Sequence, residues 1–172
     1  MAKRIDLRAY REHIASRLAD AQTEPGAPAL LGFAAGGRCW LVDLPAAGAV
    51  LPVPPLAPVP LTQRWFAGIA NVHGNLDAVI DFSQLCGGPP TSRGGAARLL
   101  RVGLWQGNNI ALLVAGLHGL KRLDALCPNS ESPAAFPWCG ENFTDAQGGH
   151  WTQIDVGRLL ADPLLLDAAL AE

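Results

Sequence analysis

A single pattern occurs twice in this sequence, 74 positions apart, and it restricts the possible folds more than any other feature. The first copy, residues 65–85, reads WFAGIANVHGNLDAVIDFSQL. Two apolar runs separated by Gly74 and Asn75 are typical of a β-hairpin, because glycine and asparagine tolerate the positive φ angles of a tight turn. Asp81 then stands where the N-cap of a helix is expected. The stretch predicts a β-hairpin followed by a short capped helix.

The second copy predicts a related half-domain. Four residues recur at one offset: Gly74, Ile80, Asp81 and Leu85 are followed by Gly148, Ile154, Asp155 and Leu159. Trp138 is a looser counterpart of Trp65, so the second copy differs by about one residue before its turn. A repeat of this length is too long for a solenoid unit and favours two related halves. Chance matching is the alternative, since each of these residue types is common.

Before the first copy, the sequence predicts a helix, a hairpin and an extended segment. Apolar residues within 6–21 recur on one helical face, and acidic residues nearly offset the basic ones. This helix is therefore expected to dock on its own domain rather than on a membrane. Residues 29–44 predict a hairpin around a Gly-Gly turn, with a further strand at 49–53. Proline recurs through 44–61, which favours an extended crossing over the surface.

Between and after the copies, the chain predicts further strands and a last helix. The loop at 86–97 is rich in Gly, Pro and Ser, and the boundary between the halves is expected near it. Residues 99–116 predict another hairpin, whose apolar run at 110–115 has no polar break and should be buried on both faces. Asp162 and Pro163 are expected to begin a final helix, because proline is tolerated in a first turn.

The composition limits the partners and the location. Charged residues make up 16% of the chain and the net charge is −2, whereas soluble domains average about 25% charged residues. Such a surface does not suit nucleic acid, which requires a dense basic face. The charged N-terminus does not resemble a secretory signal, and the prolines in 44–61 exclude a spanning helix there. We therefore expect a soluble cytoplasmic protein with reduced cysteines and no membrane insertion.

The sequence lacks a reactive constellation. Its cysteines and histidines do not have metal-ligand spacing, and no phosphate-binding loop or nucleophile motif is present. We therefore expect no catalytic residue, no metal and no cofactor. Asp81 and Asp155 are better explained as paired helix caps than as a catalytic pair. A binding protein is predicted, and an unrecognised enzyme that uses Cys86 or His150 is the alternative.

Residues 52–87 resemble the signature region of the CheW-like family of chemosensory adaptors. In that family a proline-rich crossing leads into a hairpin of the form G-[VI]-x-N-x-R-G, and a [VI]-[VI]-D-[LF] step leads into a helix. Here these motifs stand at Gly68–Gly74 and Val79–Phe82. The resemblance extends over about residues 29–160 and is weaker in its later part. The sequence of residues 65–71 and the N-terminal helix are most similar to PilI, the branch of the family found in type IV pilus (twitching) systems.

The resemblance implies a mainly β fold: two five-stranded SH3-like β-barrels around a shared core, with an N-terminal amphipathic helix and a C-terminal helix. It divides the chain into an N-terminal helix and linker at 1–28, a CheW-like domain at 29–165 and a tail helix at 166–172. It also implies a non-catalytic cytoplasmic adaptor associated with membrane-bound receptor arrays. Its partners would be the cytoplasmic tip of a methyl-accepting chemoreceptor and the regulatory domain of a CheA-type histidine kinase.

By motif position, the resemblance places receptor contacts on the first hairpin, at Ile69, Asn71, Val72, His73 and the turn residue Gly74. Structural turn and cap roles are expected for Gly68, Asp81, Gly148 and Asp155. The family usually has arginine where this chain has His73. Histidine lacks the permanent charge of arginine, so a weaker or pH-dependent receptor contact is the hypothesis. A module that binds the kinase but not the receptor is the second alternative function.

Overall fold

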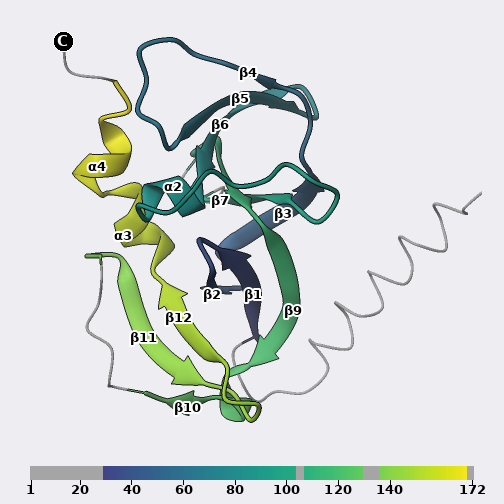
Figure 1. Ribbon diagram of the computed structural model, residues 1–172, viewed down its shortest axis with the longest axis vertical. Coiled ribbons are helices and arrows are strands. Elements are labelled where there is room, and N and C mark those ends of the chain that lie inside the picture. The colour runs from purple at the N-terminus through teal and green to yellow at the C-terminus, as the bar shows by residue number, and fades with distance from the viewer. Residues whose placement is uncertain (1–28, 104–106, 130–135, 170–172) are drawn as a thin grey trace, which may run out of the picture.

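Twelve strands and four short helices form the part of the chain that the structure describes, which comprises residues 29–103, 107–129 and 136–169 of a computed structural model (Figure 1). The predicted N-terminal helix at 6–21, and the whole of 1–28, lie outside these residues. Within the described residues, no helix has the length and apolar character needed to cross a bilayer. The strands are β1 (Ala29–Ala35), β2 (Arg38–Asp43), β3 (Ala47–Pro52), β4 (Leu56–Ala57), β5 (Phe66–Val72), β6 (Asn75–Asp81), β7 (Arg98–Val102), β8 (Ile110–Val114), β9 (Gly116–Arg122), β10 (Cys127–Pro128), β11 (Cys139–Thr144) and β12 (His150–Ile154).

The strands form two sheets with the same order of pairing. One sheet runs β3-β7-β8-β6-β5-β4 and the other β9-β1-β2-β12-β11-β10. Each has a single parallel pair in the same place, β6 with β8 and β12 with β2, while the other pairs are antiparallel. Each sheet has six strands rather than the expected five, because a two-residue strand, β4 or β10, extends one edge.

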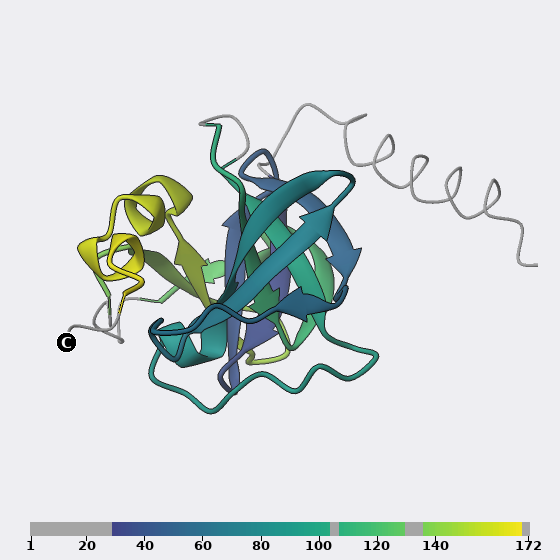
Figure 2. The same cartoon turned by 90° about the horizontal axis from the view of Figure 1, so that it is seen from above.

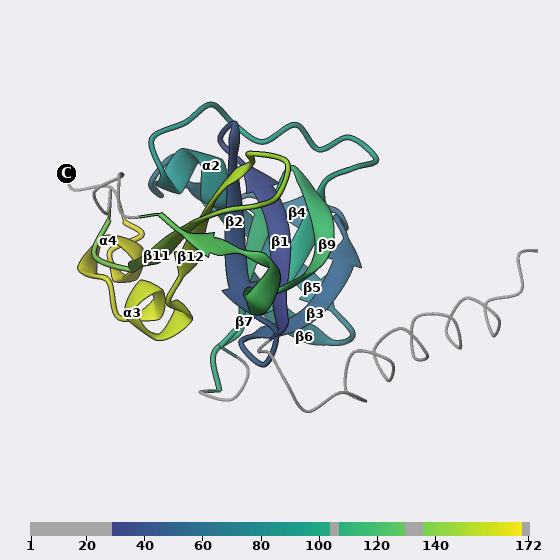
Figure 3. The ribbon, with the colours of Figure 1, turned by 90° about the horizontal axis from the view of Figure 1, so that it is seen from below.

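The boundary expected near 86–97 is wrong. That loop joins α2 to β7 within one sheet, and in Figure 2 it runs, in teal, along the outside of the strands. The second sheet instead combines the N-terminal hairpin β1–β2 with strands from the C-terminal third, and Figure 3 shows β2 between β1 and β12. The halves are therefore interleaved along the chain, because the parallel partner of β12 lies more than a hundred residues before it.

Both copies of the repeated pattern form a hairpin followed by a capped helix. In the first copy Asp81 N–H donates to the Trp65 carbonyl at 2.7 Å, and in the second Asp155 N–H donates to the Trp138 carbonyl at 2.9 Å. A bulge follows each of these tryptophans, in β5 and in β11. Trp138 is therefore the structural counterpart of Trp65. The second copy has one more residue between its tryptophan and its turn glycine, and this residue lies in the turn, which is longer than that of the first copy.

Three apolar clusters account for the packing. The largest lies between the sheets and contains Phe33, Trp40, Phe82 and Trp138, with the ring centroids of Trp40 and Phe82 5.1 Å apart. A second cluster uses the opposite face of the first sheet, and a third the opposite face of the second. The central strands of each sheet are thus buried on both faces, which explains why they are apolar without alternation. The prediction of burial for 110–115 is confirmed for β8, whereas Ala115 at the end of the run is exposed.

The helices within the described residues are short, and an aspartate is the N-cap of three of them. They are α2 (Phe82–Leu85), a 3₁₀ turn (Leu123–Ala125), α3 (Val156–Leu160) and α4 (Pro163–Leu166). Asp162 caps α4 with Pro163 in its first turn, as predicted. The tail helix expected at 166–172 is wrong at its start, because the helix ends at Leu166 and Ala169 instead bridges to Thr62; residues 170–172 lie outside the described part. The backbone N–H of Gln63 donates to the Ala168 carbonyl at 2.8 Å, which fixes this path.

Candidate partner-binding site

The tip of the β5–β6 hairpin is a two-residue turn made by His73 and Gly74. Val72 pairs directly with Asn75, so the turn lies one residue earlier than the predicted Gly74-Asn75. Both turn residues have positive φ, 52° and 89°, as type I′ hairpin turns require. The Asn71 side-chain oxygen accepts a hydrogen bond from the Gly74 N–H at 2.9 Å. Asn71 and Gly74 therefore shape the turn, and His73 is exposed at its tip.

Gly68 forms the bulge that curves β5. Its φ is 127°, and a Cβ atom at this position would collide with the carbonyl oxygen of Ala57 on the neighbouring strand β4. Glycine is needed here both for its backbone conformation and for the close approach of β4. The bulge sets the direction in which the hairpin leaves the sheet.

The two faces of the hairpin differ. On one face Ile69 is half-buried and Asn71 exposed, and opposite Asn71 on β6 stands Leu76, whose exposed fraction is 64%. The same face of β6 carries Ile80 into the core between the sheets. Val72 points the other way and is only 4% exposed, so its assignment as a partner contact is wrong: it belongs to the core of the first sheet.

The sequence motif does not single out Leu76 as a surface residue. The apolar run from Leu76 to Ile80 predicts a strand, and the side chains of alternate residues face opposite ways. Applied from Ile80 backwards, that alternation places Leu76 and Ala78 on the face that continues the central core. The sequence does not show where the second sheet stops covering this face. Leu76 lies beyond the covered part and is exposed to solvent.

A buried ion pair lies beneath the hairpin. Asp77 on β6 is fully buried, and an Arg101 guanidinium N–H from β7 donates to its carboxylate at 2.8 Å. Arg101 Nε also lies 2.5 Å from the second oxygen of the Asp77 carboxylate. Contact at two points fixes the orientation of both side chains. In the other sheet, the strand registers place Trp151 at the position of Asp77 and Gly32 at the position of Arg101. A Cβ atom on Gly32 would lie 3.0 Å from the Trp151 ring, so the two halves fill one position by different means.

The second hairpin has a longer turn, around Gly148, whose φ is 79°. Asp145 holds it: its carboxylate accepts hydrogen bonds from the Gln147 and Gly149 N–H groups and from Trp151 Nε1 at 2.9 Å. These bonds, the Trp151 one first, lower the pKa of Asp145 below its ordinary value. This tip lacks an exposed apolar residue equivalent to Leu76 among the described side chains.

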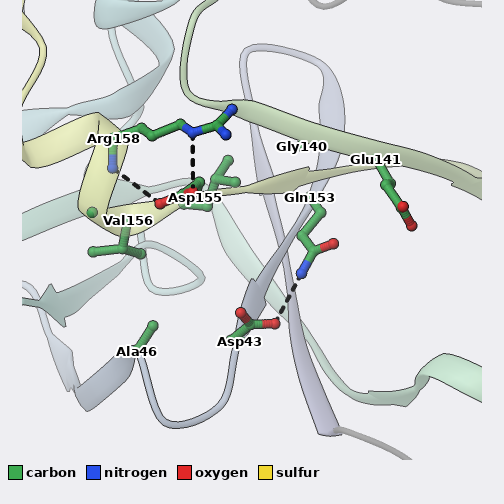
Figure 4. A pocket seen from close by; sticks show the side chains of 10 residues that line it. Asp43, Ala46, Gly140, Glu141, Gln153, Asp155, Val156 and Arg158 are labelled. Atoms are coloured by element: carbon green, nitrogen blue, oxygen red, sulfur yellow. Dashed lines mark hydrogen bonds and ion pairs between the residues drawn. The ribbon is translucent and has the colours of Figure 1, made fainter.

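The two cap aspartates have different surroundings. Asp81 is buried under the loop that follows α2, and it accepts hydrogen bonds from α2 and from Thr91. Asp155 caps α3 through the Arg158 N–H and lines an open pocket with Asp43, Glu141 and Gln153, shown in Figure 4. The pocket contains neither Cys86 nor His150 in its lining.

The four cysteines lie in different environments. Cys127 is exposed, Cys139 is buried, and Cys39 and Cys86 are intermediate. Burial, with smaller contributions from neighbouring groups, raises the pKa of Cys86 to about 12. A thiol with such a pKa remains protonated near neutral pH, and the thiolate is the nucleophilic form. Cys86 is therefore poorly suited to the enzymatic alternative.

Comparison with known proteins identifies the family. The family model of the CheW-like domain matches residues 29–162, more than three quarters of the chain. The crystal structure of the scaffolding protein TtCheW from Thermoanaerobacter tengcongensis shares the fold, with a TM-score of 0.66, 16% sequence identity, and coverage of 78% of this chain and 88% of that one. No curated protein sequence gives a significant match. On the family match and the shared fold, this chain belongs to the CheW-like domain family.

Proposed function

We propose that this protein is a non-catalytic adaptor that joins the cytoplasmic tip of a chemoreceptor to the regulatory domain of a CheA-type histidine kinase. The observation that carries the proposal is the exposed face of the β5–β6 hairpin, which presents Ile69, Asn71 and Leu76 beside the turn residue His73. Membership of the CheW-like family and the likeness to a protein described as a scaffold support it. The protein would act in the cytoplasm, at membrane-bound receptor arrays.

The hairpin is suited to binding because its shape is already fixed in the free protein. The bulge at Gly68, the Asn71 side-chain bond and the buried Asp77–Arg101 pair hold it before any partner arrives. A surface that is ordered in advance loses less conformational entropy on association. Leu76 would supply the apolar anchor, and the polar groups around it would fix the orientation of the partner.

Co-purification tests the role of the hairpin. We expect the Leu76→Asp variant of the full chain to lose the receptor of the same cell while it retains the CheA-type kinase. Leu166→Asp is the matched control, because Leu166 is 69% exposed on α4, away from the hairpin, and both partners should remain bound. A folded Leu76→Asp protein that retains both partners would disprove the proposed receptor surface.

His73 provides a second test of the same surface. The CheW-like family usually has arginine at this position, so His73→Arg should strengthen receptor binding if the contact is polar. The hypothesis of a pH-dependent contact predicts that receptor-fragment affinity changes between about pH 5.5 and 8. An affinity that stays flat over this range, measured by calorimetry, removes that hypothesis and leaves the adaptor role untouched.

The presence of His73 in place of arginine also favours one alternative, a kinase-binding module that is uncoupled from the receptor. In that case His73→Arg binds the receptor no better than the natural protein, and only the kinase co-purifies.

We further propose, from the likeness of residues 65–71 to PilI, that the output is twitching motility through type IV pili. Deletion of the gene should then abolish twitching zones on agar and leave swimming unchanged.

A further inference from the structure

The aspartate that caps α2 is covered by a segment of its own chain. Its side chain is buried, and besides the N–H groups of Ser83 and Gln84 it accepts two hydrogen bonds from Thr91: the Thr91 N–H donates to one carboxylate oxygen at 2.8 Å and the Thr91 hydroxyl to the other at 2.7 Å. The Ser83 hydroxyl also donates to the Pro89 carbonyl at 2.6 Å. The extended segment 87–91 is thus fastened over the beginning of α2.

The equivalent aspartate of the other half has no such cover. The Asp155 carboxylate accepts a hydrogen bond from the Arg158 N–H at 3.0 Å and lies 3.4 Å from Arg158 Nε, and its side chain is 47% exposed. After α3 the chain turns into α4 and then passes to Thr62 and Gln63, so no described segment takes the place of 87–91. Beside Asp155 lies an open pocket instead, between β2, β11, β12 and α3 (Figure 4).

The pocket differs from its counterpart in charge. Its rim carries the carboxylates of Asp43, Glu141 and Asp155 and one guanidinium, that of Arg158. Gln153 Nε2 donates to the Asp43 carboxylate at 2.9 Å and holds it at the edge of the pocket. The strand registers place Leu113, Gly68 and Val79 at the corresponding positions of the covered half, and none of these is charged. The open pocket therefore favours a ligand that brings positive charge.

We propose that this pocket binds an extended segment of a partner protein in which a serine or threonine is followed closely by a basic residue. The backbone N–H and hydroxyl of that residue would donate to Asp155, as Thr91 donates to Asp81, and the basic side chain would face Asp43 and Glu141. Hydrogen bonds to an ionised acceptor are the stronger kind. The inference rests on the internal repeat and the pocket, and does not require the proposed receptor contact.

The chain itself supplies the probe. Residues 87–93 read GGPPTSR, which combines the threonine that binds Asp81 with an arginine two positions later. An end-blocked peptide of this sequence, titrated into the ¹⁵N-labelled full chain, should shift the amide signals of 140–141 and 153–158. The control peptide GGPPAAA, which lacks both hydroxyls and the charge, should bind at least tenfold more weakly.

Two substitutions give opposite expectations. Asp155→Asn should weaken peptide binding about tenfold without unfolding α3, because asparagine caps a helix as well as aspartate does. Arg158→Gln introduces the residue found at position 84 of the covered half, and it should strengthen binding severalfold, because it removes a cation that competes for Asp155.

The proposal is overturned by three results: no shift at millimolar peptide, equal binding of both peptides, or shifts confined to the region of Asp81 and Thr91. Equal affinity of the natural protein and the Arg158→Gln variant would also contradict it, and that variant does not disturb the cap. A positive titration together with failure of the Leu76→Asp test would leave this pocket in place and remove only the receptor surface.

Discussion

The shape of the β5–β6 hairpin depends on the absence of a side chain at Gly68. We expect Gly68→Ala to lower the free energy of unfolding by about 2 kcal/mol or more, because alanine is strained at a φ of 127° and its methyl group would collide with the Ala57 carbonyl. Urea unfolding followed by tryptophan fluorescence measures the change. Gly95→Ala is the control: no atom lies within 4 Å of the added Cβ, so stability should stay nearly the same.

The thiols offer a chemical test at the same scale. Iodoacetamide at pH 8 should modify Cys127 first, because it is exposed, while Cys86 should react slowly, because burial raises its pKa to about 12. Mass spectrometry of tryptic peptides over time gives the order. Modification of Cys86 as fast as Cys127 in the folded protein would show that the thiol is more accessible or more acidic than the structure indicates.

Single residues were the least predictable level. The motif identifies the hairpin but treats Val72 as a contact, although its side chain faces the core. Leu76, two residues after the turn glycine, is the exposed apolar group of that hairpin and carries no motif. Which of two alternating faces is covered depends on the position of the other sheet, and no local pattern contains that information.

Asp81 and Asp155 cap equivalent helices, α2 and α3, but only Asp81 is covered by a loop. Substituting each aspartate therefore separates the contribution of the cap from that of the covering loop. We expect Asp155→Ala to cost about 1 kcal/mol, the usual loss for an exposed N-cap. Asp81→Ala should cost about 3 kcal/mol, because it also leaves the buried Thr91 N–H and hydroxyl without their acceptor. Denaturant midpoints of the two variants compare the costs directly, and equal losses would mean that the loop adds nothing.

Elements were predicted well wherever the signal was local. Gly-Gly and Gly-Asn turns, alternation in the strands and aspartate before a short apolar run led to the β1–β2 and β5–β6 hairpins and to α2, α3 and α4. Errors lie at the ends: the turn of the β5–β6 hairpin was predicted one residue too late, and α4 stops before the predicted tail helix. Helix ends depend on tertiary contacts such as the bridge between Thr62 and Ala169, which a helical pattern does not reveal.

At the scale of the whole molecule, the two related halves fill one equivalent buried position with different residues. The Arg101–Asp77 pair in one sheet corresponds to Gly32 and Trp151 in the other. We expect Arg101→Met to lower stability by about 3–5 kcal/mol, because it leaves a buried carboxylate unpaired, and the double variant Arg101→Met/Asp77→Leu to recover most of that loss. Thermal unfolding of the three proteins tests this; a double variant no better than the single would indicate that the pair itself is required.

The arrangement of the halves was only partly predictable. The repeat at offset 74 correctly indicates two related hairpin-and-helix units, because it depends on residues close together in the chain. The division near 86–97 is wrong because the strands that complete the second sheet, β1 and β2, precede the first sheet in sequence. Long-range parallel pairing leaves no periodic signal, so topology had to come from the family resemblance and the structure.

This interleaving has a consequence for synthesis on the ribosome. The β1–β2 hairpin is translated before the other described strands, whereas its parallel neighbour β12 is translated after all of them. Until then the edge of β2 that pairs with β12, along Cys39–Val42, lacks its partner strand. Nascent chains held close together on one messenger could therefore exchange β12, and an intertwined dimer is the misfolded product to look for when the protein is overproduced.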